Sequence, residues 1–360
     1  MLELTTTSDA GVTIEVDGAP LALSWTWLRD HSLDEESFLA SAQQRIATPD
    51  DIATAGRGAA NVHDGALHVS WPNGPSTRFD VAFLGSLRDP MTAVRTGADA
   101  EAWTATTIGE RALRQPFAGY IGSDDGLRTA LEHLWRDGVV TITDVPIDKA
   151  ATRSVLERIG YVRSTIFGDL WEFSSDGGFD DTASTPLEIT PHTDGTYSHD
   201  APGLLGLHCH VYLAEGGENV FVDGHALVER LTDEARTILT DVEIPARYIG
   251  DGAHLMACRP ALRFVQGQLG QISYNHHDRA PFLLPEPAMT DVLAALRELD
   301  GLANDPSLQY EVAMRPGDMV LFDNWRVLHG RRAFRGERLI AGGYINREDV
   351  ESRSRQLAVR

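Results

Sequence analysis

One stretch of the chain concentrates side chains that can bind a metal ion. Between Pro191 and His210 the sequence PHTDGTYSHDAPGLLGLHCH contains four histidines and two aspartates. His192 and Asp194 are separated by one residue, so on a β-strand both side chains would point to the same face and could reach one ion. The pair opens into a Gly-Thr-Tyr loop beside an expected cavity. We predict that His192 and Asp194 are metal ligands.

The third ligand must be chosen among the remaining histidines. His208 and His210 have the same spacing but lie within the apolar run LLGLHCHVYL. Buried polar side chains are normally satisfied by hydrogen bonds, so we interpret this pair as structural. His199, five residues after Asp194, could complete a local site, as in a hydrolytic zinc enzyme. A ligand from a distant strand is more common, and His329, which ends the predicted strand MVLFDNWRVLHG, is the candidate that we favour.

Two histidines and one carboxylate on one face of an ion are the ligand set of non-haem Fe(II) oxygenases. An enzyme of this class that takes electrons from 2-oxoglutarate must also hold the far carboxylate of that cosubstrate, and a guanidinium binds a carboxylate through two hydrogen bonds. Arg338 leads the apolar run RLIAGGYI, where an unpaired charge would be costly. We predict Arg338 in this role, and Arg331, Arg332 and Arg335 as surface residues.

The first part of the chain, from residue 11 to about 86, is predicted to be a small β-rich unit. The sequence VTIEV-DG-APLALSWTWL has the pattern of a strand, an Asp-Gly turn and a second strand. LHVSW-PNG-PSTRFDVAFL repeats this pattern. The stretch from Arg88 to about Gln115 has no strong period, and we interpret it as a linker.

Beyond this stretch, helices alternate with strands. Gly126–Arg136 is predicted to be a helix that Gly138 stops, followed by the strand VVTITDV; Leu227–Leu239 and Asp291–Leu299 are predicted as further helices. The remaining strands, including LLGLHCHVYL and RFVQGQLGQISY, are too many and too scattered for βαβ units. Their spacing favours an antiparallel barrel or sandwich decorated by helices.

Composition narrows the class of partner. The 360 residues carry a formal net charge of −22, which argues against nucleic acid and anionic membrane surfaces as partners. The chain has two cysteines, so a disulfide framework is excluded and a reduced, intracellular setting is expected. The N-terminal sequence lacks the pattern of a signal peptide, and no apolar run is long enough to span a membrane. We expect a cytoplasmic protein.

The motifs resemble those of the γ-butyrobetaine and trimethyllysine dioxygenase family, relatives of taurine dioxygenase, and the similarity is closer to the trimethyllysine dioxygenases. It extends over essentially the whole chain and is most specific from Phe167 to Val350. The residues that carry it are His192-Thr-Asp-Gly-Thr-Tyr197, Gly203, Leu207-His208-Cys209, Gly216-Gly217, Val222-Asp223-Gly224, Tyr274-Asn275, Asp278-Arg279-Ala280, Asp323-Asn-Trp-Arg-Val-Leu-His-Gly-Arg331, Arg338, Tyr344 and Arg347-Glu-Asp-Val350.

The resemblance implies a mainly β protein with helices. Its catalytic domain would be a double-stranded β-helix, or jelly roll, over residues 101–360, after a small β-rich domain over residues 1–100. It implies Fe(II) on His192, Asp194 and His329, and 2-oxoglutarate on Arg338, with Asn219 at a position where the family has Ser or Thr. It also implies O2 as the oxidant, hydroxylation of a small-molecule substrate, and a homodimer. We expect ascorbate to serve as the reductant in vitro.

The chain departs from the family pattern in three places. No cysteine follows Trp27-Leu-Arg-Asp30, so a structural zinc is not expected. The aromatic cage for a trimethylammonium group has matches in Phe167, Trp171 and Tyr344, but a family tyrosine is replaced by Ser184. Phe167 and Trp171 could equally be simple core residues.

The third departure concerns the polar end of the substrate. Asp181 matches the residue that meets the substrate's amino group in the trimethyllysine enzymes, whereas the expected carboxylate-binding Asn after Asn275 is His276. We predict a substrate pocket formed by eight residues: Phe167, Trp171, Asp181, Ser184, Tyr197, Asn275, His276 and Tyr344. Three alternatives remain: the same chemistry, hydroxylation or desaturation, on a biosynthetic intermediate without a quaternary amine; a non-catalytic metal-binding sensor; and the zinc hydrolase.

Overall fold

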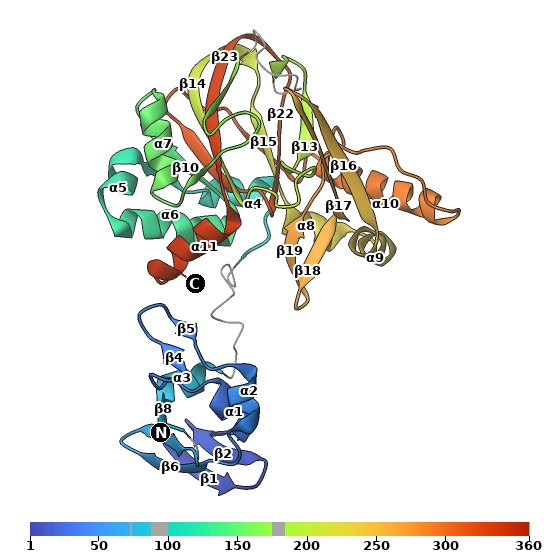
Figure 1. Ribbon diagram of the computed structural model, residues 1–360. Helices are drawn as coiled ribbons and strands as arrows, with labels where there is room; N and C mark the ends of the chain where they lie inside the picture. The colour runs from blue at the N-terminus through green and yellow to red at the C-terminus, as the bar shows by residue number, and fades with distance from the viewer. Residues whose placement is uncertain (73, 88–99, 175–183, 360) are drawn as a thin grey trace. The chain divides into compact units, whose positions relative to one another are not determined.

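The computed structural model describes residues 1–72, 74–87, 100–174 and 184–359 (Figure 1). The chain divides into two compact units, Met1–Arg95 and Thr96–Arg360. The sequence predicts two domains, residues 1–100 and 101–360. That domain boundary stays a prediction. Among the described residues, no helix is both long enough and apolar enough to cross a bilayer.

In its described residues, the N-terminal unit consists of two three-stranded antiparallel sheets (β1–β2–β3 and β6–β7–β8), the two-stranded sheet β4–β5, and short helices. Asp17 and Gly18, between β2 and β3, both have positive φ (49° and 80°), as a tight hairpin turn of the primed type requires. The core contains Ile14, Leu28 and Phe79, which are fully buried. The elements are β1 (Leu2–Thr7), β2 (Gly11–Val16), β3 (Ala19–Ser24), α1 (Trp25–Asp30), β4 (Phe38–Leu39), β5 (Gln44–Arg45), α2 (Pro49–Thr54), β6 (Ala59–His63), β7 (Ala66–Ser70), β8 (Thr77–Asp80) and α3 (Val81–Ser86).

The ends of both predicted hairpins differ from expectation. The segments WTWL and VAFL, predicted as strand, form the helices α1 and α3. The Ser24 side chain accepts a hydrogen bond from the backbone N–H of Trp27, which starts α1 as an N-cap. In α1, local capping therefore overrides the strand propensity of the aromatic residues; α3 has no such side-chain cap.

Two facing sheets make up the centre of the second unit, and the fold is the predicted jelly roll. The larger sheet has the strand order β11–β23–β14–β21–β10–β9, with β12 also paired to β23. The smaller sheet has the order β13–β22–β15–β20. Buried side chains from both sheets pack together between them, including Phe221 of β15 and Phe322 of β21, whose ring centroids are 5.2 Å apart. The strands of these sheets are β9 (Arg114–Pro116), β10 (Val139–Thr143), β11 (Val162–Arg163), β12 (Trp171–Ser174), β13 (Ile189–His192), β14 (Leu204–Gly216), β15 (Asn219–Asp223), β20 (Gln309–Val312), β21 (Met319–Asp323), β22 (Val327–Arg331) and β23 (Phe334–Ile345).

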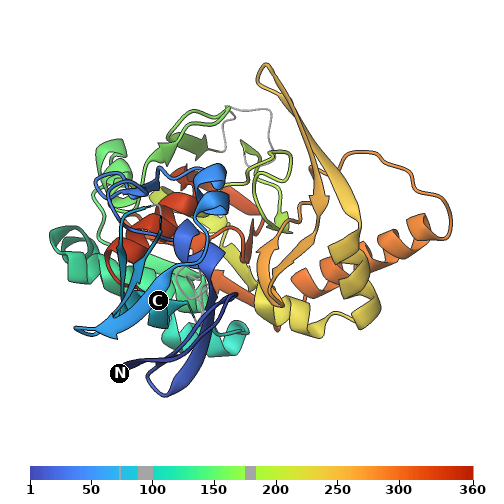
Figure 2. The same cartoon turned by 60° about the horizontal axis from the view of Figure 1, so that its bottom comes forward.

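Helices cover the jelly roll on two flanks (Figures 1 and 2). On one flank, α5, α6, α7 and α11 share a buried apolar cluster with β10, β14 and β21. On the other, α8, α9 and α10 pack with β15 and the hairpin β18–β19. The remaining elements are α4 (Ala105–Arg111), α5 (Phe117–Gly122), α6 (Asp124–Asp137), α7 (Lys149–Glu157), α8 (Gly224–Arg230), α9 (Asp233–Asp241), β16 (Glu243–Gly250), β17 (Ala253–Pro260), β18 (Leu262–Val265), β19 (Gln268–Ile272), α10 (Ala288–Ala303) and α11 (Arg347–Gln356).

Two predictions about these elements were wrong in detail. The predicted helix Leu227–Leu239 is divided into α8 and α9, because Thr232 caps α9 by accepting a hydrogen bond from the N–H of Ala235. The predicted linker contains α4 and β9 in its described part, and Trp103 is almost completely buried. The predicted helix before Gly138 is confirmed as α6, with Gly138 at φ 76°.

Candidate metal centre and active-site cavity

The two histidines predicted to bind metal face each other on neighbouring strands of the smaller sheet. The antiparallel register of β13 and β22 places His192 opposite His329, with ring centroids 4.4 Å apart. Gly330 permits this close approach, since a Cβ at that position would lie 2.5 Å from the carbonyl oxygen of Ile189. A side chain at residue 330 would therefore push the two strands apart.

Asp194 reaches the histidines from a turn and not from the strand itself. β13 ends at His192, so the same-face argument of a strand does not place Asp194. Asn324 fixes the turn: its Oδ1 accepts a hydrogen bond from the N–H of Asp194 (2.8 Å), and its Nδ2 donates to the carbonyl oxygen of the same residue (3.0 Å). The amide of Asn324 thus positions the carboxylate through the backbone.

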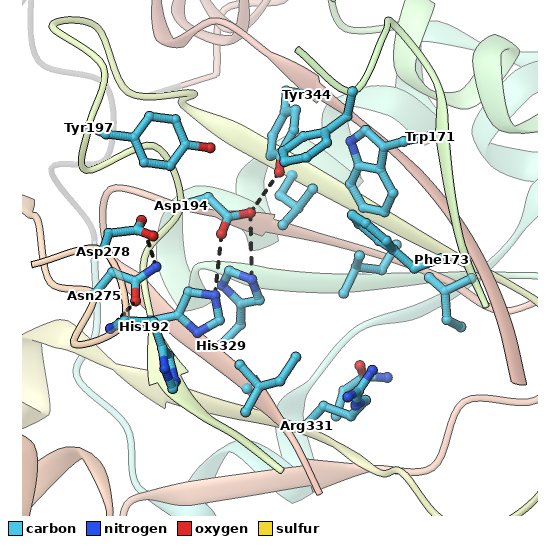
Figure 3. Close-up of a pocket in the computed structure, with 18 of the residues that line it drawn as sticks. Trp171, Phe173, His192, Asp194, Tyr197, Asn275, Asp278, His329, Arg331 and Tyr344 are labelled. Carbon is cyan, nitrogen blue, oxygen red and sulfur yellow. Dashed lines mark hydrogen bonds and ion pairs between the residues drawn. The ribbon is translucent and has the colours of Figure 1, made fainter. Parts of the chain in front are cut away.

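The three side chains converge on one point (Figure 3). The Nε2 atom of His192 lies 3.3 Å from Oδ1 of Asp194, and the Nε2 atom of His329 lies 3.7 Å from Oδ2. The carbonyl oxygen of Thr190 lies 2.9 Å from Nδ1 of His192 and can only accept a hydrogen bond. His192 therefore carries its proton on Nδ1 and directs the lone pair of Nε2 toward the cluster, as a metal ligand must.

Burial and charge set the protonation states of the cluster. Burial acts to lower the pKa of His192, but the hydrogen bond and charge of Asp194 outweigh it and raise the pKa. Burial lowers the pKa of His329 to about 3. The pKa of Asp194 is held well below its usual range, because its histidine neighbours and a hydrogen bond from Tyr344 outweigh burial, which acts to raise it. An ionised carboxylate and a neutral His329 are the forms that bind a metal.

The cluster lines a cavity of about 880 Å³, counting the open space at its mouth. Arg338 and Asn219 line the same cavity and are almost completely buried, with Nη2 of Arg338 donating to Oδ1 of Asn219 at 3.1 Å. Two further donors there, Nε of Arg338 and Nδ2 of Asn219, have no hydrogen-bond partner among the described residues. Unsatisfied buried donors are costly, so this part of the cavity fits a carboxylate.

Aromatic side chains form another wall of the cavity. Trp171 lies 4.7 Å from Phe173 and 5.7 Å from Tyr344, measured between ring centroids. Gly342 makes room for this arrangement, because a Cβ there would lie 2.3 Å from the indole of Trp171. Phe167 and Tyr197 complete the wall, and the hydroxyl of Tyr344 donates to Oδ2 of Asp194 at 2.8 Å. Tyr344 therefore joins the aromatic wall to the metal cluster.

Comparison with known proteins agrees with this geometry. The model of the family described as "Taurine catabolism dioxygenase TauD, TfdA family" matches residues 106–344. The chain belongs to this family. It is 30% identical to the mitochondrial trimethyllysine dioxygenase of Gallus gallus, with 94% of this chain and 84% of the relative covered. It is 31% identical to dioxygenase str8 of Strobilurus tenacellus, with 92% and 84% covered.

The fold is shared with solved structures of distant sequence. A crystal structure of asparagine oxygenase in complex with Fe(II), 3-hydroxyasparagine and succinate superposes with a TM-score of 0.50 at 15% identity. It covers 62% of this chain and 80% of that chain. As a member of the TauD/TfdA family, the protein is a 2-oxoglutarate-dependent dioxygenase that uses Fe(II) and O2.

The position of Arg331 in the structure differs from the sequence prediction. It was predicted to lie on the surface, but it is 6% exposed and lines the cavity. Its Nη2 donates to the carbonyl oxygens of Thr185 and Leu187 (2.5 and 2.7 Å), so it holds the segment before β13. Burial and the nearby Arg338 lower the pKa of Arg331 to about 10. Arg335 is exposed and Arg332 is partly exposed, with ion pairs to Glu188 and Glu311.

The predicted substrate residues are only partly brought together. The cavity is lined by Phe167, Trp171, Tyr197, Asn275 and Tyr344. Ser184 is buried and is absent from that lining, and His276 lines a neighbouring smaller cavity. Asp181 lies outside the described residues. The roles of these residues in substrate binding stay predictions.

Sequence reasoning assigned no role to two polar residues of the lining, His277 and Asp278. Oδ2 of Asp278 accepts hydrogen bonds from Nδ2 of Asn275 and from the hydroxyl of Thr196, both at 2.9 Å. The Asp278-Arg279-Ala280 motif was a signal for Asp278. For His277, the pair His276-His277 gave no indication of which residue faces the cavity.

The other histidines of the opening stretch lie elsewhere. His208 and His210 are buried, with Nδ1 of His208 lying 2.8 Å from the Thr152 hydroxyl and 3.1 Å from Nε2 of His210. His199 is exposed. Within the described ranges, the one cluster of three potential ligands is His192, Asp194 and His329, which gives the zinc-hydrolase alternative no support.

Proposed function

We propose that His192, Asp194 and His329 hold the Fe(II) ion and that Arg338 and Asn219 bind the distal carboxylate of 2-oxoglutarate. The observation that carries this proposal is a pair of unsatisfied buried donors, Nε of Arg338 and Nδ2 of Asn219, in the same cavity as the two histidines and the carboxylate. A metal cluster alone would suit many reactions. The cluster combined with a buried carboxylate site suits an enzyme that oxidises a 2-oxo acid together with its substrate.

When bound, Fe(II) and 2-oxoglutarate supply the oxidation itself: O2 is consumed, 2-oxoglutarate becomes succinate and CO2, and one oxygen atom enters a C–H bond of the substrate. The chain's own residues hold and orient the side chains of the proposed metal ligands. Asn324 fixes the turn of Asp194, Thr190 sets the tautomer of His192, and the Tyr344 hydroxyl orients one carboxylate oxygen. The aromatic wall keeps water from the reacting C–H bond.

The substrate we propose is a small amine-bearing acid, similar to trimethyllysine or γ-butyrobetaine. The rings of Phe167, Trp171 and Tyr344 offer π faces to a quaternary ammonium group. The similarity to named trimethyllysine dioxygenases at about 30% identity supports the same class. Asn275 in the same cavity offers an amide for the polar end of the substrate.

One observation favours a second candidate within the same chemistry. Ser184 replaces the family tyrosine and is not part of the cavity lining, so the cage lacks one wall. Losing one wall should weaken the binding of a quaternary ammonium by roughly 0.5–2 kcal/mol. The alternative is hydroxylation or desaturation of a biosynthetic intermediate that has no quaternary amine.

The test is an aerobic assay with Fe(II), ascorbate and 2-oxoglutarate against trimethyllysine, γ-butyrobetaine, lysine and phosphonate analogues, with products identified by mass spectrometry. A gain of one oxygen on trimethyllysine, matched by succinate, supports the first candidate. Succinate formed without any hydroxylated product in this panel supports the chemistry but rejects these substrates. No succinate with any compound would reject the proposed function.

A further inference from the structure

We call the cavity lined by His192, Asp194 and His329 the iron cavity. A second, smaller cavity lies beside it. It encloses about 390 Å³, counting open space, and its polar lining includes Thr196, Arg259, His276 and Arg279. Asn275 lines both cavities, and the Thr196 hydroxyl donates to Asp278, which lines the iron cavity. The two cavities therefore share the side chain of Asn275, which is labelled in Figure 3 together with Asp278.

Three separate segments bring Arg259, Arg279 and the polar Thr196 together in this second cavity. Arg259 belongs to β17, whose hairpin with β16 is seen in Figures 1 and 2. Arg279 follows Asp278, and its backbone forms a bridge with Ala246 of β16. The turn after Asp194 supplies Thr196. Two guanidinium groups thus line one small cavity in a protein whose net charge is −22.

Neither Arg259 nor Arg279 forms an ion pair with a carboxylate in the part of the chain that the structure describes, whereas Arg347 pairs with both Asp323 and Glu351. Among the described residues, Nη2 of Arg259 donates only to the carbonyl oxygens of Gly195 and Thr196, at 3.4 and 3.3 Å. These distances are longer than those of a good hydrogen bond. Burial lowers the pKa of Arg259 and the charge of Arg263 adds to this shift, whereas the charge of Asp200 opposes it without outweighing it.

An acidic protein has many carboxylates that could neutralise these arginines, so two guanidiniums that share a cavity without one indicate an external partner. A guanidinium offers planar, paired N–H groups, which match a carboxylate or a phosphate. We propose that this cavity is a binding site for a small anion of the carboxylate or phosphate type, held by Arg259 and Arg279. The anion is either an acid group of the substrate itself or a free metabolite.

An anion bound in this cavity would affect the position of Asp194 at the metal centre. Arg259 contacts the carbonyl oxygens of the two residues that follow Asp194, so an anion that draws Arg259 away weakens its hold on that turn. This consequence rests on the proposed function, whereas binding of the anion does not. The two can therefore be tested separately.

The first experiment is calorimetric titration of the metal-free protein with inorganic phosphate and with acetate, at low and at moderate ionic strength. We expect saturable binding of at least one anion, weakened by about tenfold or more in Arg259→Gln and in Arg279→Gln, because each removes a charged hydrogen bond donor. Arg247→Gln is the matched control, since Arg247 is exposed on β16 and does not line the cavity. Binding should persist in Arg338→Met, which removes one of the two arginines that line the iron cavity.

Each outcome decides the proposal. Absence of saturable binding of both anions to the wild-type protein overturns it, as does equal weakening by Arg247→Gln or loss of binding in Arg338→Met alone. If the site is confirmed, steady-state kinetics identify the source of the anion. A raised KM for an acidic substrate in Arg259→Gln, at unchanged KM for 2-oxoglutarate, identifies the substrate's own acid group. A phosphate-dependent change in turnover that Arg259→Gln abolishes identifies a free anion.

Discussion

Two pairs of histidines in the jelly roll differ in what surrounds them. His192 and His329 have ring centroids 4.4 Å apart, and His208 and His210 have ring centroids 4.5 Å apart. The first pair shares the carboxylate of Asp194 and lines a cavity, whereas the second pair shares the hydroxyl of Thr152 in the packed interior. Proximity of two imidazoles therefore does not make a metal site; a shared anion and an accessible space do.

The same difference appears in the electrostatics. Burial lowers the pKa of both His208 (to about 4) and His210, so this pair is stable as neutral hydrogen-bonding groups. In the first pair, Asp194 counteracts burial and raises the pKa of His192. One pair is thus a structural element of the core, and the other, together with Asp194, has the residue types and spacing that could hold a metal ion.

Removing one imidazole should abolish iron binding and activity in the first pair but not in the second. We expect His329→Ala to lose bound iron and to lower succinate formation by at least about 10³-fold, more than the 10–100-fold typical of residues that only support a ligand. His210→Gln should retain both properties within a few fold. Iron content and succinate measured on the same preparations check this. Retained activity in His329→Ala would mean that the metal ligands are assigned wrongly.

The second pair should control stability at low pH. The folded-state pKa of His208 is about 4, below its ordinary value of 6.5, so between these values the unfolded chain binds more protons. The stabilising contribution is complete above pH 6.5 and is lost as the pH falls toward 4, by up to about 3 kcal/mol. Urea unfolding of wild type and His208→Gln at pH 7 and pH 4 measures it. A difference between the two proteins that does not change with pH, while the exposed His199→Gln control behaves as wild type, would refute this.

A substitution at Arg338 should weaken cosubstrate binding without changing metal binding. We expect Arg338→Met to weaken 2-oxoglutarate by about 10–100-fold, as the loss of charged hydrogen bonds predicts, and to leave iron affinity unchanged. Arg335→Met, an exposed position on the same strand, is the control. Equal effects of the two substitutions would show that the carboxylate site lies elsewhere.

Removing the Tyr344 hydroxyl should have the smallest effect of these substitutions. Tyr344→Phe keeps the ring of the aromatic wall but removes the hydrogen bond to Asp194, so iron affinity should fall by about tenfold with little change in KM for substrate. Metal titration and steady-state kinetics distinguish the two roles of this residue. A raised KM at unchanged iron affinity would assign the hydroxyl to the substrate instead.

The sequence predicted the residues whose role depends on type and register. The residue types of His192, Asp194 and the remote His329, and an arginine that leads an apolar strand, were sufficient to predict which residues meet in the cavity, although the strand argument for Asp194 was wrong. Gly138 and the alternating strands likewise predicted local structure. Each of these signals is carried by a few neighbouring residues or by a simple period.

What the sequence did not predict depends on how distant segments meet. Arg331 stands in an arginine-rich stretch, and only the carbonyl oxygens of Thr185 and Leu187 explain its burial. His276 and His277 are adjacent and chemically identical, so loop conformation alone decides that His277 lines the iron cavity. Asp194 lies in a turn that Asn324, 130 residues away, fixes through side-chain hydrogen bonds.

The most direct test of the central claim is an anaerobic titration of Fe(II) into the protein in the presence of 2-oxoglutarate, followed by visible absorption. The claim is that His192, Asp194 and His329 bind iron in the cavity where Arg338 holds the cosubstrate. It predicts a charge-transfer band that saturates at one Fe(II) per chain, disappears in His329→Ala and needs more 2-oxoglutarate in Arg338→Met. A band that persists in His329→Ala, or that never forms in the wild-type protein, would contradict it.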